Sequence, residues 1–228
     1  MSPPVRTNHA MTYDAVRQRV VLFGGYNGFQ ALSDTWEWDG TTWAERTPAA
    51  SPPQRYEHAL AYDTTRQRVV LFGGNGAQPL SDTWEWDGTT WVQRTPTTSP
   101  PARYLHALAY DMARQRVVLF GGIGTQPLSD TWEWDGTTWV QRTPAMPPPA
   151  RFGHALAYDT VRQRVVLTGG VNSVVLADTW EWDGTTWVDL APTRSPAVAY
   201  HSLAYDAARQ RLVLFDGSNS ADTWLYLP

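Results

Sequence analysis

The sequence predicts an all-β propeller of five blades, each a sheet of four antiparallel strands, with the last blade lacking its outer strand. Two observations support this fold class. The segment Asp-Thr-Trp-Glu-Trp-Asp-Gly-Thr-Thr-Trp occurs four times, and its copies start at Asp34, Asp82, Asp130 and Asp178. A histidine also recurs from His9 to His201 at spacings of 49, 48, 48 and 47 residues. Repetition with this period is typical of propellers, in which each blade buries its faces against its neighbours.

Each unit is expected to contain four strands. The second unit illustrates them, with the first strand at 58–62 and the second at 68–72, an apolar run that ends at Gly73-Gly74. The third and fourth strands flank Asp87-Gly88, a strong signal for a hairpin turn. Proline-rich loops such as 95–101 then lead to the next unit, because proline cannot join a strand ladder.

The hairpin places its side chains on two faces. Trp86 is predicted opposite Trp91, with Trp84 on the same face, so three indoles lie together. One tryptophan buries about 150–250 Å², more than a lone hairpin can cover. The indole face is therefore expected to stack against the neighbouring unit. Glu85 and Arg94 share the other face and are predicted to form a cross-strand ion pair rather than a catalytic site.

The repeats predict a single propeller domain. Its units cover approximately residues 1–50, 51–98, 99–146, 147–193 and 194–228. The last unit supplies three strands and leaves an edge at 222–227. An unpaired apolar edge can pair with another chain, so self-association through this strand is possible.

Composition excludes several classes of function. The net charge of -4 gives no general attraction to nucleic acid or an anionic membrane, and no partner of either kind is expected. The chain has no cysteine, and we expect no cofactor and no metal. Its first residues lack the features of a signal peptide, no apolar run approaches a membrane span, and a soluble chain is expected. All 18 basic residues are arginine, which favours a GC-rich bacterial source.

The units resemble kelch repeats. The resemblance rests on Arg55 and His58 before and in the first strand, on Gly73-Gly74 after the second, and on the tryptophan-rich hairpin. It implies a propeller fold, although kelch propellers usually have six or seven blades. A galactose-oxidase-like activity is excluded because that enzyme needs a cysteine-linked tyrosine. Activity like that of a kelch-type sialic-acid mutarotase stays open, since it needs only a general acid and a general base.

A binding site is expected where the blades differ. Strand direction alternates, so the loops after the second and fourth strands should share one face, around the mouth of a central channel, and these loops vary between units. Exposed aromatic rings and a few polar groups there suit a peptide or a sugar. The alternative is that these rings pack on the loops beneath them. The candidates are Tyr26, Phe29, Tyr56, Glu57, Tyr104, Phe152 and Tyr200.

The repeated charged residues allow two interpretations. Arg55, Arg103 and Arg151 precede the first strands on the same face and are candidates for binding carboxylates. Their nearly identical context favours a structural role in the loops. The five histidines could form a metal ring, but one at the same position in each unit is more typical of packing.

The sequence therefore favours a non-catalytic recognition or scaffold propeller that binds a peptide, a protein or a glycan. A carbohydrate-acting enzyme centred on Glu57 is one alternative. The other is a repeat fragment or engineered scaffold with no ligand.

Overall fold

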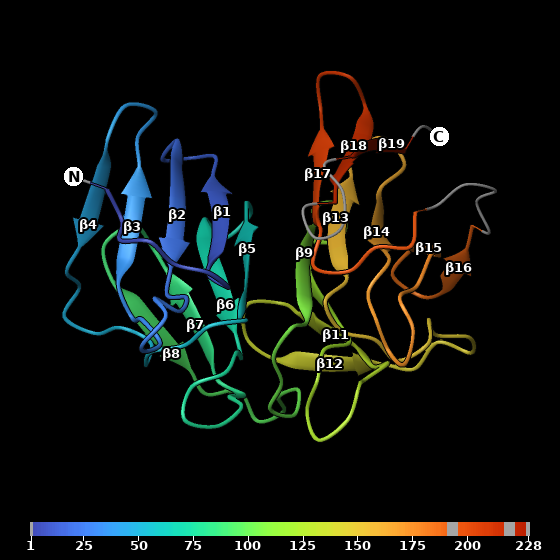
Figure 1. Cartoon of the computed structure of the whole chain (residues 1–228), viewed down its shortest axis with the longest axis horizontal. Coiled ribbons are helices and arrows are strands. Elements are labelled where there is room, and N and C mark those ends of the chain that lie inside the picture. The colour runs from blue at the N-terminus through green and yellow to red at the C-terminus, as the bar shows by residue number, and fades with distance from the viewer. Residues whose placement is uncertain (1, 191–195, 217–221, 227–228) are drawn as a thin grey trace. The chain divides into compact units, whose positions relative to one another are not determined.

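The computed structural model describes residues 2–190, 196–216 and 222–226, and every regular element within them is a β-strand (Figure 1). The first sheet contains β1 (Ala10–Asp14), β2 (Arg19–Phe23), β3 (Thr35–Trp38) and β4 (Trp43–Arg46). The second contains β5 (Ala59–Asp63), β6 (Arg68–Phe72), β7 (Thr83–Trp86) and β8 (Trp91–Arg94). Both are antiparallel and keep the strand order of the sequence, as predicted for blades.

The remaining sheets follow the same plan. The third contains β9 (Ala107–Asp111), β10 (Arg116–Phe120), β11 (Thr131–Trp134) and β12 (Trp139–Arg142). The fourth contains β13 (Ala155–Asp159), β14 (Arg164–Thr168), β15 (Thr179–Trp182) and β16 (Trp187–Asp189). The last has three strands, β17 (Ser202–Asp206), β18 (Arg211–Phe215) and β19 (Thr223–Tyr226), as predicted. Residue 227 of the predicted edge lies outside the described residues. The chain is an all-β propeller of five blades.

The blades group into two compact units. One comprises residues 1–104 with 136–139, and the other comprises 105–135 with 140–228. Within each unit, the first strands of successive blades pack together, β1 on β5 in one and β13 on β9 and β17 in the other. In each unit, the contacts between strands of successive blades are therefore made mainly by the first strands.

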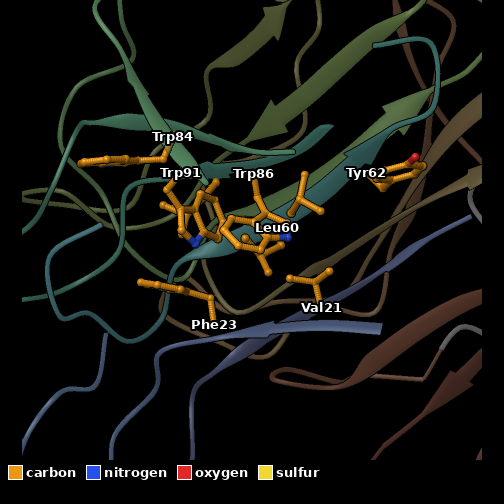
Figure 2. Packing of buried hydrophobic residues seen from close by; sticks show 9 residues of the cluster. Val21, Phe23, Leu60, Tyr62, Trp84, Trp86 and Trp91 are labelled. Carbon is orange, nitrogen blue, oxygen red and sulfur yellow. The ribbon is translucent and has the colours of Figure 1, made fainter. Parts of the chain in front are cut away.

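The tryptophan face of the second blade packs on the first blade. The predicted register is confirmed, with Trp86 opposite Trp91. Figure 2 shows both indoles facing Val21 and Phe23 of β2, and the rings of Phe23 and Trp91 meet edge-on with centroids 5.3 Å apart. All four side chains are at most 1% exposed, so this stacking is the core of the blade interface.

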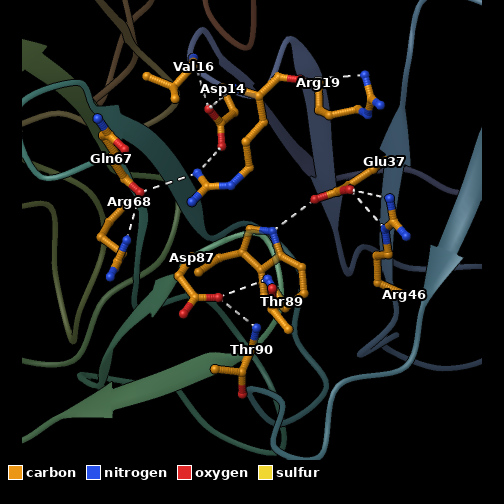
Figure 3. Close-up of polar contacts among 12 residues, drawn as sticks. Asp14, Val16, Arg19, Glu37, Arg46, Gln67, Arg68, Asp87, Thr89 and Thr90 are labelled. Carbon is orange, nitrogen blue, oxygen red and sulfur yellow. Dashed lines mark hydrogen bonds and ion pairs between the residues drawn. The ribbon is translucent and has the colours of Figure 1, made fainter.

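The indole N–H groups find partners across the same interface. Trp86 Nε1–H donates to Oε1 of Glu37 at 3.0 Å, and Trp91 Nε1–H donates to Oγ1 of Thr35 at 2.9 Å. Arg46 pairs with the other oxygen of Glu37, so this buried carboxylate serves both its own blade and the next (Figure 3). The equivalent pair of Arg94 with Glu85 confirms the predicted ion pair.

The hairpin turn is a four-residue loop closed by an aspartate side chain. Oδ1 of Asp87 accepts the backbone N–H groups of Thr89 and Thr90 at 2.8 Å each (Figure 3). Gly88 lies at φ +94°, a region that glycine enters without a steric penalty. The turn therefore depends on the Asp-Gly pair that signalled it.

Among the described residues there is no helix with the length and apolar character needed to cross a membrane.

Candidate functional site

The residue immediately before the first-strand histidine adopts a left-handed backbone in every blade. We call this the pre-histidine position. Its φ angles lie between 54° and 62° at Asn8, Glu57, Leu105, Gly153 and Tyr200. Glycine and asparagine tolerate this region, whereas other residues pay roughly 1–2 kcal/mol for it. Three blades therefore place a strained residue type here.

A second left-handed position in each blade provides an internal comparison. It lies before the second strand and is glutamine in all five blades, at Gln18, Gln67, Gln115, Gln163 and Gln210. The two positions share a backbone conformation, yet one is uniform and the other differs in every blade. Conformation alone therefore does not account for the residues at the pre-histidine position.

Backbone hydrogen bonds link the pre-histidine positions of neighbouring blades. Glu57 N–H donates to the carbonyl of Asn8 at 2.9 Å in one unit. In the other, Gly153 N–H donates to Leu105 at 2.9 Å, and Tyr200 N–H donates to Gly153 at 2.7 Å. These hydrogen bonds place the variable pre-histidine residues of consecutive blades next to one another.

In the first unit, aromatic residues gather beside Glu57. The rings of Tyr26 and Tyr56 lie 5.5 Å apart at an interplanar angle of 52°. Burial raises the pKa of Tyr56, and the nearby Glu57, Tyr26 and Tyr104 raise it further. We call Tyr26, Tyr56, Tyr104 and Glu57 the tyrosine–glutamate cluster. Each member is half-buried, so each keeps part of its surface open to solvent.

Two asparagines support this cluster. Nδ2 of Asn75 donates to the hydroxyl of Tyr56 at 2.9 Å, and the two residues also form a backbone bridge. Nδ2 of Asn8 lies 3.4 Å from Oε1 of Glu57. Neither asparagine was among the residues predicted from the sequence. Both lie in segments that differ between blades, so this variation could have identified them as candidates from the sequence.

Glu57 differs from the carboxylates of the repeat. Burial raises its pKa, and no described residue forms an ion pair with it. Glu37, Glu85 and Glu133 each pair with an arginine of the adjacent strand. The cluster therefore presents a half-buried acidic group whose charge no described side chain balances.

The second unit has an aromatic pair that includes the pre-histidine residue Tyr200. The rings of Phe152 and Tyr200 lie 6.4 Å apart. The ring of Tyr200 lies over Gly153, where an added Cβ would come within 2.9 Å of Cε1. Tyr200 is 58% exposed, so its ring offers contact area to a ligand.

Phe29 is the most exposed of the predicted residues, with 92% of its surface open. It lies at the tip of a loop that Asn27 closes by accepting the N–H groups of Phe29 and Gln30 through Oδ1. The exposed ring is thus held on a structured turn. The predicted aromatic residues differ in accessibility, from half-buried to nearly free.

The structure places the predicted arginines in the interior. Arg55 and Arg151 are fully buried and bind Asp82 and Asp178 through both terminal nitrogens, at 2.6–2.8 Å. Arg103 is equally buried, and its Nε–H donates to the carbonyl of Pro101. The carboxylates that Arg55 and Arg151 meet belong to the fold. This corrects their assignment as surface ligand contacts, because burial leaves no guanidinium face for a ligand.

The histidines pack between blades. His58 is buried edge-on against Phe23 with ring centroids 5.5 Å apart, and burial lowers its pKa to about 3. His154 makes the same contact with Phe120, and its pKa is also lowered to about 3. Within the described part of the chain, no group of three or more His, Cys, Asp or Glu side chains is arranged to hold a metal ion.

Comparison with known proteins identifies the repeat. The family model of the KLHDC2/KLHL20/DRC7 Kelch-repeats domain matches residues 46–217. A search of curated proteins finds no significant match. The family match covers most of the chain, and the first four blades carry the repeated arginine, histidine, double glycine and tryptophan positions in register, whereas the last has Val198 for the arginine and Asp216 for the first glycine. The chain therefore belongs to the kelch-repeat family.

Proposed function

We propose that this chain is a non-catalytic recognition module that binds a protein or peptide on the surface formed by the loops after the second and fourth strands of its blades. Kelch domains generally mediate protein interactions. The observation that carries the proposal is the contrast between the two left-handed positions. The uniform glutamines serve the fold, whereas the pre-histidine residues differ in each blade and include strained types.

The exposed aromatic residues support a protein ligand. Interfaces are enriched in aromatic anchors, and Phe29 and Tyr200 present rings that the fold itself leaves open. The loop backbones of this surface are paired by bridges, such as Tyr26 with Ala31 on either side of Phe29 and Phe152 with Val171. A held backbone lowers the entropy lost on binding.

Selection from a random peptide library displayed on phage tests this function. We expect peptides to be enriched on the wild-type chain and lost on a Phe29→Ser/Tyr56→Ser/Tyr200→Ser variant. A Thr89→Ala/Thr137→Ala variant is the control, because these residues lie in the hairpin turns. Peptides that bind the first variant as well as wild type would contradict the proposed surface.

A carbohydrate-acting enzyme is the second candidate, and Glu57 supports it. A half-buried carboxyl with a raised pKa resembles a general acid. NMR of sialic-acid anomers tests this candidate. Exchange that is accelerated by wild type and not by Glu57→Gln would support it, and exchange unchanged by wild type would refute it.

We also propose that β19 supports self-association. Trp224 and Leu225 are 39% and 48% exposed on this edge strand. Sedimentation velocity over a hundredfold range of concentration should show reversible association that Leu225→Lys weakens. A strict monomer over that range contradicts this contact.

A further inference from the structure

We propose that the tyrosine–glutamate cluster receives a basic side chain, lysine or arginine, of a protein partner. This inference rests on the proposed recognition function and names the chemistry of one contact. The cluster lies within one compact unit and consists of Tyr26, Tyr56, Tyr104 and Glu57.

The charge of Glu57 has no counter-ion among the described residues. The buried glutamates of the third strands are paired with arginines: Arg46 pairs with Glu37, and Arg94 pairs with Glu85. Glu57 is half-buried, and its described neighbours contribute only the amide of Asn8 at 3.4 Å. A partly desolvated carboxylate binds a cation more strongly than a fully hydrated one does. An incoming ammonium or guanidinium would supply the missing charge.

The aromatic rings of the cluster also suit a cation. The rings of Tyr26 and Tyr56 lie 5.5 Å apart and are inclined at 52°, so the two rings pack against each other in a tilted pair. The electron-rich faces of tyrosine rings attract cations, and their apolar edges suit the methylene stem of lysine or arginine. The carboxylate of Glu57 comes to the same place, because it meets Asn8, whose neighbour Thr7 forms a backbone bridge with Tyr26. The cluster thus combines π faces, phenol oxygens and one carboxylate.

The backbone of Glu57 is held in the left-handed region. Its φ of 57° is a conformation that glycine or asparagine adopts at less cost, and other blades use Gly153 and Asn8 at this position. Glutamate at this position makes the fold less stable than glycine or asparagine would, and it forms no ion pair with a described residue. This trade is typical of residues kept for function.

The test uses peptides selected on the wild-type chain from the random displayed library, resynthesised and measured by isothermal titration calorimetry. We expect the peptides to share a lysine or arginine. Replacing that residue by norleucine should weaken binding at least about tenfold, and Glu57→Gln should weaken the parent peptide by a similar factor. Combining both changes should cost little more than either alone, because each removes the same contact.

The matched control is Gln67→Asn, which changes the other left-handed position of the same blade and should leave binding unchanged. A charge exchange gives a second readout: Glu57→Lys should restore affinity for a peptide whose basic residue is replaced by glutamate. Circular dichroism confirms that each variant is folded.

The outcomes separate the two proposals. Failure to enrich any peptide contradicts the recognition function and this contact together. Peptides that bind normally to Glu57→Gln, or that lack a shared basic residue, overturn this inference and leave the recognition function standing. Binding of a neutral glycan that Glu57→Gln preserves overturns it as well.

Discussion

The Nε1–H of Trp91 donates to Oγ1 of Thr35 at 2.9 Å, although the two residues are 56 positions apart. The same contact recurs between Trp139 and Thr83 and between Trp187 and Thr131. The threonine hydroxyl thus accepts from the buried indole of the next blade, and the repeated segment carries both halves of the contact.

Replacing Thr35 by valine should destabilise the chain by about 1–3 kcal/mol, because the buried N–H of Trp91 then has no acceptor. Thr35→Ser retains the hydroxyl and should cost clearly less. Urea unfolding monitored by tryptophan fluorescence measures both variants. Equal losses for valine and serine would show that the methyl group matters more than the hydrogen bond.

Replacing Arg55 by valine should cost about 3–5 kcal/mol, because Asp82 keeps a largely buried charge after its cation is removed. Adding Asp82→Asn should recover part of that loss, since the amide is neutral and can still accept from Nε1–H of Trp84. Urea unfolding of the two single variants and the double variant measures this coupling. Additive losses would argue against a coupled pair.

The buried histidines should make the chain sensitive to mild acid. His58 and His154 have pKa values lowered to about 3 by burial, against 6.5 for an exposed histidine. Between these values the unfolded chain binds the proton and the folded chain does not. Stability should therefore be full above pH 6.5 and fall on acidification, by up to about 1.4 kcal/mol per pH unit for each histidine.

A variant with His58→Leu and His154→Leu should lose much of this pH dependence between pH 7 and pH 4. The control is His9→Leu, because His9 is only half-buried whereas His58 and His154 are buried. Urea unfolding at several pH values gives the slopes. An unchanged slope in the double variant would assign acid sensitivity to other groups.

Replacing Glu57 by asparagine should stabilise the chain by about 1 kcal/mol, because asparagine accepts the left-handed backbone and no described ion pair is lost. Thermal unfolding measures the gain. Gln67→Asn should give a gain of similar size, since Gln67 has φ of 56° and is exposed. Destabilisation by Glu57→Asn would show that the glutamate serves the fold.

Replacing Leu190 by arginine should stabilise the fourth blade by about 0.5–1 kcal/mol. The N–H of Leu190 donates to the carbonyl of Thr179, the register in which Arg94 faces Thr83 in the second blade. Burial raises the pKa of Glu181, and its contact with Arg162 is long, at 3.5 Å. The new arginine should lower that pKa, so the gain should be present at pH 7 and vanish as Glu181 is protonated. NMR titration of Glu181 and urea unfolding at pH 7 and pH 3 check both effects.

Local sequence was sufficient for the strands, their register and the ion pair of Glu85 with Arg94. Alternation, turn residues and fixed spacing act over a few residues, and the fourfold repetition repeats each signal. The accessible surface was harder to predict. Arg55 and Tyr56 are adjacent in the sequence, yet one is fully buried against Asp82 and the other lies half-open beside Glu57.

The sequence by itself determined the repeat, the five-blade fold and the three-stranded last blade, because these follow from periodic patterns within one chain. Only the tertiary structure decided how the charges and backbone conformations are used. In the fold, Arg55 forms an ion pair with Asp82, 27 positions away, and Thr35 accepts a hydrogen bond from Trp91 of the next blade. The tertiary structure also revealed that the pre-histidine residue and the glutamine before the second strand are left-handed in each blade. Such pairings depend on which segments meet in space, and the distance along the chain between partners carries no local signal.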